Sequence, residues 1–402
     1  MLSGTPFVDL HDPEFLTDPF PTYSRLRDHA AAYYVSADDV WILTRYDDVA
    51  RAARSPGIFS SRVGLAAAAR RSGTGVSFRI GAPNVRLLLS LDPPEHTAFR
   101  RAVSAAFTPR AIDTRAARVA SIADELLTDL VDRSLSNDAD FYRDVAEPLP
   151  VRALAEMLGV PPEMHAELRS WTRVITSDLD PRTAEQQAGV GMDMLRFFRS
   201  AVRERRRAKR DSDDVISVLA RATEFGLSDY EVTAFCAFLL FAGIETTTNL
   251  LTNLVAVLTS EPDVQRELRS NPDFVGGALE EALRFDAPVQ GMWRGTTEAV
   301  KVGDTVIPAG ARVLLAFGSA GRDDRHYENA NRFVLRRGAT DHLAFSAGPH
   351  YCLGASLGRL EAAEAVRALL RRTAWIDATD SERTTTLVLH GFVAQGVCVT
   401  PR

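Results

Sequence analysis

Apolar residues follow a helical spacing through most of the chain and a strand spacing only in short pieces. The most apolar stretch covers 232–258 and follows the capping-box pattern Ser228-Asp-Tyr-Glu231. A helix from there to about Ser260 would be roughly 45 Å long, at 1.5 Å per residue, and would cross a whole domain. A membrane span of this length is also conceivable, but Glu245 beside three threonines at its centre disfavours it. We expect a buried central helix.

The remaining segments predict a mainly helical chain with a small β region. Several helical segments have Pro or Asp near their starts, as first turns commonly do. No internal repeat, low-complexity tract or linker divides the sequence, so we expect one domain over residues 1–402. The helical segments are 22–29, a short helix from Tyr46, 93–107, 112–135, 145–159, 161–177, 181–210 and 355–370; the strand-like pieces are 32–35, 41–44, 300–302, 306–307, 313–317 and 397–400.

Composition and charge narrow the class of protein. Of 402 residues, 46% are hydrophobic and 25% charged, which is typical of a globular chain. A net charge of −6 offers no global attraction to nucleic acid or to an anionic membrane. The basic run 203–210 precedes several acids. Cations favour the end of one helix and acids the start of the next, so we assign this run a structural role. The three cysteines are too far apart for a disulfide framework, and no secretory signal is visible, so we expect a cytoplasmic protein.

The loop around Cys352 is the most informative segment. It reads Phe345-Ser-Ala-Gly348-Pro-His350-Tyr-Cys352-Leu-Gly354 and precedes a helical pattern. A cysteine before a helix lies near exposed amides and the positive end of the dipole, which favour a thiolate. Glycine allows the backbone to approach a flat neighbour closely. An isolated cysteine is usually an inert core residue, but a thiolate held in this way can ligate a metal, including haem iron.

This segment resembles the haem-ligand signature of the cytochrome P450 superfamily, in which Phe, Gly, His or Arg, Cys and Gly recur at these spacings. The resemblance extends from about Asp18 to the C-terminus. It implies a mainly helical triangular prism that encloses haem b (iron-protoporphyrin IX). It also implies that Cys352 is the axial ligand of the iron and that Phe345 belongs to the haem site.

A second segment, Ala242-Gly-Ile-Glu245-Thr246-Thr247, lies in the middle of the long helix. Gly weakens a helix through backbone entropy and Thr through hydrogen bonds back to carbonyls, so we expect a local distortion. On its own the segment could be a packed helix with one glutamate. It resembles the acid–alcohol motif of the family, which implies that Glu245 relays protons and that Thr246 donates a hydrogen bond during oxygen activation.

The charged pair Glu281 and Arg284 is spaced i,i+3 on one predicted helix face. Most such pairs are solvated and contribute little. Placed before the cysteine loop, this pair resembles the buried pair of the family, which a later arginine completes. We assign that structural role to Arg332, with Arg337 as the runner-up.

Four further residues resemble the set that holds the haem propionates: His96, Arg100, Arg294 and His350. His96 and Arg100 are spaced i,i+4 and share a helix face. A planar guanidinium suits bidentate binding of a carboxylate. A surface histidine on a helix is the alternative for His96.

By family position, parts of 60–90, 238–243, 289–293 and 392–394 would line the substrate pocket. These segments are largely apolar and predict a hydrophobic organic substrate. Arg62, Arg70, Arg71 and Arg79 could hold a polar group, although mobile surface arginines are commoner. The pocket residues that we select are Phe238, Ala242, Gly243, Val289, Met292, Trp293 and Val393.

The resemblance implies a monooxygenase that inserts one oxygen atom from O2 into its substrate. The chain has no Gly-rich dinucleotide loop and no clustered cysteines, so electrons must come from outside, from a ferredoxin with its reductase. We expect a monomer without nucleic-acid or membrane partners. Candidate residues for docking an acidic ferredoxin are Arg101, Arg110, Arg322, Arg325 and Arg359.

Three alternatives remain open at this point. A peroxygenase would work with peroxide alone, without a reductant. A haem-binding sensor or carrier would never turn over with any electron donor. A helical binding protein without haem would purify colourless.

Overall fold

The computed structural model describes residues 8–62, 86–176, 184–208, 212–222 and 226–402. The chain forms two compact units. Residues 1–74, 253–352 and 381–393 make the first, and residues 75–252, 353–380 and 394–402 make the second. The single domain expected over 1–402 stays a prediction. Of the selected first-loop arginines, Arg70, Arg71 and Arg79 lie outside the described residues.

A five-stranded sheet forms the centre of the first unit, with strand order β1-β2-β7-β4-β3. Only β2 and β7 pair in parallel; the other neighbours are antiparallel. The predicted strands at 32–35, 41–44 and 313–317 are confirmed, with small shifts at their ends, whereas β3 and β4 were not predicted. The strands are β1 (Ala32–Val35), β2 (Val40–Leu43), β3 (Phe59–Ser60), β4 (Met292–Thr296) and β7 (Arg312–Leu315), beside a separate hairpin of β5 (Val300–Val302) and β6 (Thr305–Ile307).

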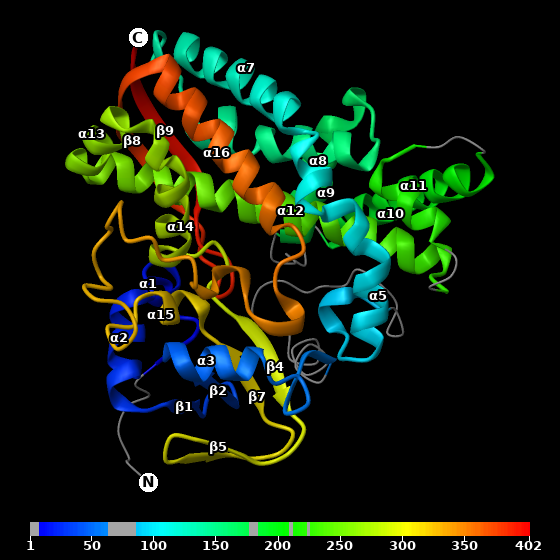
Figure 1. The fold of residues 1–402 in the computed structure, drawn as a ribbon, viewed down its shortest axis with the longest axis vertical. Coiled ribbons are helices and arrows are strands. Elements are labelled where there is room, and N and C mark those ends of the chain that lie inside the picture. Colours follow the sequence, from blue (N-terminus) through cyan, green and yellow to red (C-terminus); the bar gives the residue numbers. More distant parts are fainter. Residues whose placement is uncertain (1–7, 63–85, 177–183, 209–211, 223–225) are drawn as a thin grey trace. The chain divides into compact units, whose positions relative to one another are not determined.

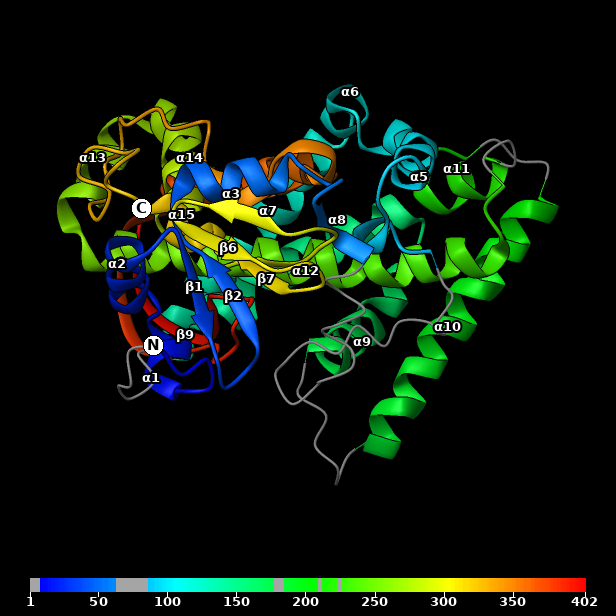
Figure 2. The same ribbon diagram turned by 90° about the horizontal axis from the view of Figure 1, so that it is seen from below.

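Both faces of this sheet are covered by apolar side chains. Along β7, Val313 and Leu315 belong to one core cluster with Val49 of α3, which lies along the strands in Figure 2. Leu314 points to the other face and packs in a cluster with Leu26 of α2. This alternation follows from the period of two in a strand. The helices of this unit are α1 (Pro13–Thr17), α2 (Phe20–His29), α3 (Tyr46–Ala53), α13 (Pro262–Ser270), α14 (Val275–Phe285) and α15 (Phe317–Gly321).

The second unit is mainly helical. Its core joins apolar residues of several helices around the first half of α12. The helix α16 packs along α7, and Figure 1 shows the two side by side. The elements that lie wholly or mostly in this unit are α5 (Glu95–Ser104), α6 (Pro109–Asp113), α7 (Ala116–Ser134), a π-turn (Tyr142–Ala146), α8 (Pro148–Leu158), α9 (His165–Thr176), α10 (Ala184–Arg207), α11 (Val215–Arg221), α12 (Asp229–Ser260), α16 (Ala355–Arg372), and the paired strands β8 (Thr373–Arg383) and β9 (Phe392–Pro401).

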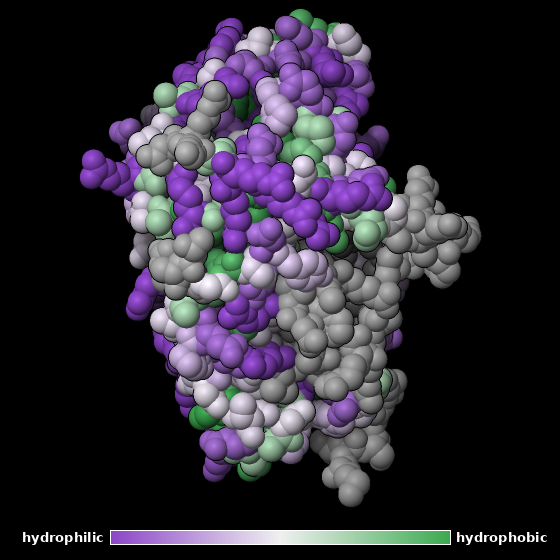
Figure 3. All heavy atoms as spheres, turned by 90° about the vertical axis from the view of Figure 1, so that its right-hand side faces the viewer, coloured by the Kyte–Doolittle hydropathy of each residue, from purple (hydrophilic) through white to green (hydrophobic). Residues whose placement is uncertain are grey.

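The long helix α12 confirms the predicted central helix. Its capping box forms as expected: the Ser228 amide donates to Glu231 Oε2 at 2.9 Å, and the Glu231 amide donates to Ser228 Oγ at 3.2 Å. Among the described residues it alone is long and apolar enough to cross a membrane, and 72% of its most apolar window is buried inside the protein. A buried core helix passes the same test. On the face shown in Figure 3, hydrophilic residues cover most of the described surface and hydrophobic residues are scattered.

The basic run at the end of α10 has a structural role, as predicted. Arg205 lies 3.9 Å from Asp214, the N-cap of α11, and Arg206 lies 3.0 Å from Asp229 at the start of α12. These acids occupy the positive ends of their helices.

Candidate active site

The loop before Cys352 is held by the backbone of the first unit. The Cys352 amide donates to the Phe345 carbonyl at 2.8 Å, which closes the loop. Gly348 has φ +67°, and a Cβ there would lie 2.9 Å from both the carbonyl oxygen of Ala53 and Cα of Arg54. A larger residue would therefore be both strained and in collision with the end of α3. The predicted need for close backbone approach is met here by a neighbouring helix of the protein itself.

Side chains around the loop are also fixed. Nε2 of His350 and Oγ of Ser61 are 3.0 Å apart and form a hydrogen bond. The Phe345 ring lies between the rings of His342 and Tyr351, at centroid distances of 5.8 and 6.3 Å. Cys352 itself is partly buried, forms no disulfide and stands two residues before Gly354, the N-cap of α16.

Ser346 is strained. Its φ of 62° and ψ of −168° fall in a region that glycine occupies almost alone, at a cost of about 1–3 kcal/mol for other residues. Its Oγ is buried and has no hydrogen-bond partner among the described residues. Serine is therefore unfavourable here in two ways: its backbone conformation is strained, and its buried hydroxyl makes no hydrogen bond within the described part of the chain.

We expect Ser346→Gly to stabilise the protein by about 1 kcal/mol, because relief of strain exceeds the entropy that glycine loses on folding. Urea unfolding followed by circular dichroism measures the change. Asn137→Gly is the matched control, since Asn137 also has a positive φ of 53° but asparagine tolerates that region. A loss of stability in Ser346→Gly alone would show that the hydroxyl makes a contact worth more than the strain.

Of the proposed pocket residues of the first unit, Met292 and Trp293 lie on β4 and Val289 just before it, whereas Val393 lies on β9 and is 44% exposed. Arg294 is buried, with 3% of its surface exposed, and donates from Nη1 to the Trp293 carbonyl at 2.8 Å. The Trp293 ring lies 4.9 Å below the guanidinium of Arg312. Val289 forms a β-bridge with Leu389, which brings the segment before β4 to the segment that leads to β9.

The acid–alcohol segment lies in the second unit, in an uninterrupted helix. The Thr246 hydroxyl donates to the Ala242 carbonyl at 2.7 Å, and the Thr248 hydroxyl donates to the Ile244 carbonyl at 2.9 Å. The expected hydrogen bonds from threonines back to carbonyls are therefore present. They do not interrupt α12, so the prediction of a local distortion was wrong. Gly243 lies close to α8, because a Cβ there would be 3.1 Å from Leu154 Cδ2.

Glu245 has a strongly perturbed acidity. Burial and the negative charge of Glu147 together raise its pKa to about 7, against the opposing positive charge of Arg173. Glu147 is itself buried and pairs with Arg169 and, at 3.1 Å, with Arg173 on α9. A carboxyl group with a pKa near 7 can both give and accept a proton at neutral pH. This Glu147 cluster has no sequence motif, and the sequence analysis missed it.

The two predicted propionate ligands of α5 share a helix face. His96 is 1% exposed, so the alternative of a surface histidine was wrong. Arg100 follows one turn later and is partly buried. Their role towards a cofactor remains a prediction.

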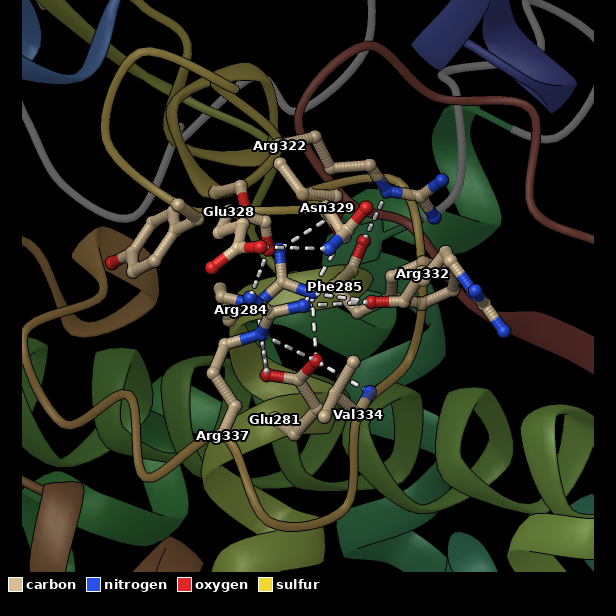
Figure 4. Close-up of polar contacts among 12 residues, drawn as sticks. Glu281, Arg284, Phe285, Arg322, Glu328, Asn329, Arg332, Val334 and Arg337 are labelled. Carbon is tan, nitrogen blue, oxygen red and sulfur yellow. Dashed lines mark hydrogen bonds and ion pairs between the residues drawn. The ribbon is translucent and has the colours of Figure 1, made fainter.

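Glu281 and Arg284 form a fully buried ion pair with 2.7 Å between Oε1 and Nη2. Figure 4 shows Arg337 reaching the same carboxylate, with its Nε 3.0 Å from Oε1. The choice of Arg332 was wrong, because Arg332 supplies only its backbone carbonyl, which accepts from Arg284 at 3.0 Å. Arg337, the runner-up, completes the set. It is 11% exposed and also donates to the backbone carbonyls around Asn329.

Arg322 was wrongly assigned to partner docking. Its guanidinium lies 3.6 Å from the ring centroids of both Phe20 and Phe285, and Nε donates to the Phe285 carbonyl at 2.6 Å. Burial lowers the pKa of Arg322 to about 10. Arg325 is half exposed but pairs with Asp28 and Asp323 at 3.1 and 3.3 Å.

Glu361 of α16 is a buried carboxyl that the sequence analysis also missed. Burial raises its pKa to about 8, opposed only by a hydrogen bond with the Thr247 hydroxyl. Its Oε1 has no partner among the described residues. A glutamate at helical spacing between apolar residues gives no sign that it is neutral and buried.

Comparisons with known proteins identify the family. Residues 175–395 match the family model described as Cytochrome P450. The chain is 38% identical to cytochrome P450 107B1 of Saccharopolyspora erythraea, over 90% of this chain and 89% of that one. It is 37% identical to the cytochrome P450 monooxygenase PikC of Streptomyces venezuelae, over 92% and 88%. The structure of CYP109E1 from Bacillus megaterium in complex with testosterone matches with a TM-score of 0.82 and 30% identity, over 96% and 98%.

This protein belongs to the cytochrome P450 family. It has the mainly helical fold of that family with its small β region, and it is an oxidoreductase of the monooxygenase class whose cofactor is haem with cysteine-ligated iron. The resident side chains fit such a cofactor. A single cysteine outside any disulfide, in a loop fixed by backbone contacts, suits an iron that a porphyrin already ligates.

Proposed function

We propose that the protein inserts one oxygen atom from O2 into a hydrophobic small molecule, with Cys352 as the thiolate ligand of haem b. The observation that carries this proposal is the cysteine loop. It holds a cysteine that is not part of a disulfide, is closed by the bond between the Cys352 amide and the Phe345 carbonyl, and packs so tightly at Gly348 that no side chain fits. The bound haem supplies the activation of dioxygen, and a thiolate ligand favours cleavage of the O–O bond.

The chain supplies protons and holds the cofactor. We assign proton delivery to Glu245, whose pKa near 7 allows it to exchange protons with water at neutral pH, and to the adjacent Thr246 hydroxyl. The cations proposed for the propionates are His96, Arg100, Arg294 and His350. Phe345 packs beside the loop that carries the ligand.

The substrate class is hydrophobic. The residues proposed for the pocket are apolar or small, and they suit a ligand held mainly by contact area: Phe238, Ala242, Gly243, Val289, Met292, Trp293 and Val393. The complex of CYP109E1 with testosterone supports this class, because that ligand is a largely apolar molecule.

Electrons are proposed to come from a ferredoxin and its reductase, in a cytoplasmic, monomeric enzyme. With Arg322 buried between two phenylalanines, the exposed Arg101 and Arg110 are better candidates for contact with an acidic partner. Arg325 and Arg359 keep that assignment as weaker candidates.

The test is the absorption difference spectrum of the dithionite-reduced protein with and without carbon monoxide. We expect a strongly red-shifted Soret band, and we expect Cys352→Ala to lose it, because the shift requires a thiolate ligand. Cys398→Ala, at an exposed cysteine on β9, is the matched control and should keep the band. A band typical of histidine-ligated haem in the wild type would contradict the assignment of Cys352.

A further inference from the structure

A buried histidine joins three segments of the first unit. Nδ1 of His390 lies 2.6 Å from Oδ1 of Asp286, which follows directly on α14. Nε2 of the same ring lies 3.0 Å from the carbonyl oxygen of Thr17 at the end of α1. His390 is 2% exposed and Asp286 is 5% exposed, so water does not compete for these contacts.

The two contacts define the charge of the ring. A carboxylate oxygen and a carbonyl oxygen only accept hydrogen bonds, whereas a neutral imidazole has one N–H and one lone pair. A neutral His390 would therefore direct a lone pair at an oxygen atom at one of its two contacts. Only the imidazolium form donates at both nitrogens.

The surrounding charges are compatible with this ion pair. Burial acts to raise the pKa of Asp286, but His390, Arg383 and Arg322 together hold it below its ordinary value. Arg383 lies 3.5 Å from both Asp286 Oδ2 and His390 Nδ1. Phe20 meets the imidazole edge-on, with 5.7 Å between ring centroids. Asp286 is thus the carboxylate shared by three cations.

The ion pair lies at the junction of two segments that pair in register. The Gln290 amide donates to the Val388 carbonyl at 2.7 Å, and the His390 amide donates to the Pro288 carbonyl at 3.0 Å. These bonds flank the bridge between Val289 and Leu389. The junction therefore fixes one segment against the other.

A third element reinforces the junction. Nδ2 of Asn253, on α12, donates to the backbone carbonyls of both Asp286 and His390, at 3.1 and 3.0 Å. The backbone on both sides of the ion pair is thus held by a single buried amide.

We propose that His390, as an imidazolium bound to Asp286, is a positioning residue that fixes the two segments carrying Val289 and Val393. This inference rests on the proposed function, because both residues are proposed to line the substrate pocket. A side chain that cannot donate at both contacts loses one of the two hydrogen bonds and loosens 388–393.

Hydrogen–deuterium exchange of the holoenzyme tests this proposal at the amides of Gln290 and His390. We expect His390→Gln to lower their protection about tenfold, because glutamine cannot donate to both acceptors as a cation does. His390→Arg, a permanent cation, should retain protection. His11→Gln is the matched control, since His11 and Asp38 form a 2.9 Å pair of which the histidine is half exposed, and it should change nothing at these amides.

The comparison of the variants separates charge from packing. Full protection in His390→Gln would overturn the proposal, and so would a loss of protection in His390→Arg equal to that in His390→Gln. The carbon monoxide band should be the same in all these variants. An abnormal band in the wild type would count against the proposed function and not against the role of His390.

Discussion

Replacing Arg284 with methionine is expected to destabilise the fold by about 3–5 kcal/mol, because it leaves a buried carboxylate without its principal partner. Arg284 is 0% exposed and binds Glu281 through two nitrogens, at 2.7 and 2.8 Å. It also donates to the carbonyls of Gly321, Ala330 and Arg332, and each of these bonds would be lost. Arg337 reaches Glu281 through Nε alone at 3.0 Å and cannot replace these bonds.

Equilibrium unfolding in urea measures the loss, with Arg196→Met as the matched control. Arg196 and Asp193 have the same i,i+3 spacing but are 70% and 58% exposed, so we expect a change below about 0.5 kcal/mol there. Similar losses in the two variants would show that burial does not determine the strength of the Glu281 pair.

The sequence predicted the fold where a hydrophobic period extends over many residues. The central helix was placed to within a residue at its end, because a capping box and a long apolar run agree. The strands β4 and β8 were missed for a different reason. β4 buries Arg294 and Gly295, and most of β8 is exposed, so neither alternates apolar and polar residues. These segments are strands because they pair with other strands, and the local sequence pattern does not indicate that pairing.

The candidate site shows a similar limit. Spacing along the chain indicates that Glu281 and Arg284 share a helix face, but it cannot show which distant arginine folds back to them. The answer, Arg337, depends on the path of the loop around Asn329. Likewise, nothing local to Arg322 indicates that two phenylalanines from separate helices enclose it. Motifs predicted the residues proposed for the chemistry. The charge of Glu147, which raises the pKa of Glu245, and the buried carboxyl of Glu361 became visible only in the tertiary structure.

Glu361→Gln is expected to make the protein more stable at alkaline pH. The folded chain keeps the Glu361 proton up to a pKa of about 8, whereas the unfolded chain releases it near the ordinary value of 4.5. Between these values the folded state binds more protons, so wild-type stability falls as the pH rises through this interval. At about 1.4 kcal/mol per pKa unit, the contribution is on the order of 5 kcal/mol.

Urea unfolding at a series of pH values measures this effect. Glutamine keeps a carbonyl oxygen that can accept from the Thr247 hydroxyl, and it cannot ionise. The variant should therefore lack the decline, and the gap between the two proteins should widen with pH. Glu364→Gln is the matched control one turn along α16, where the carboxylate pairs with Arg367 at 2.5 Å, and it should follow the wild type. Parallel curves for wild type and Glu361→Gln would show that Glu361 ionises normally. A widening gap would establish that Glu361 is neutral where it contacts Thr247, the residue after Thr246. The proposed proton-delivery segment would then have two carboxyls that titrate near neutral pH, Glu245 in the segment itself and Glu361 in contact with it.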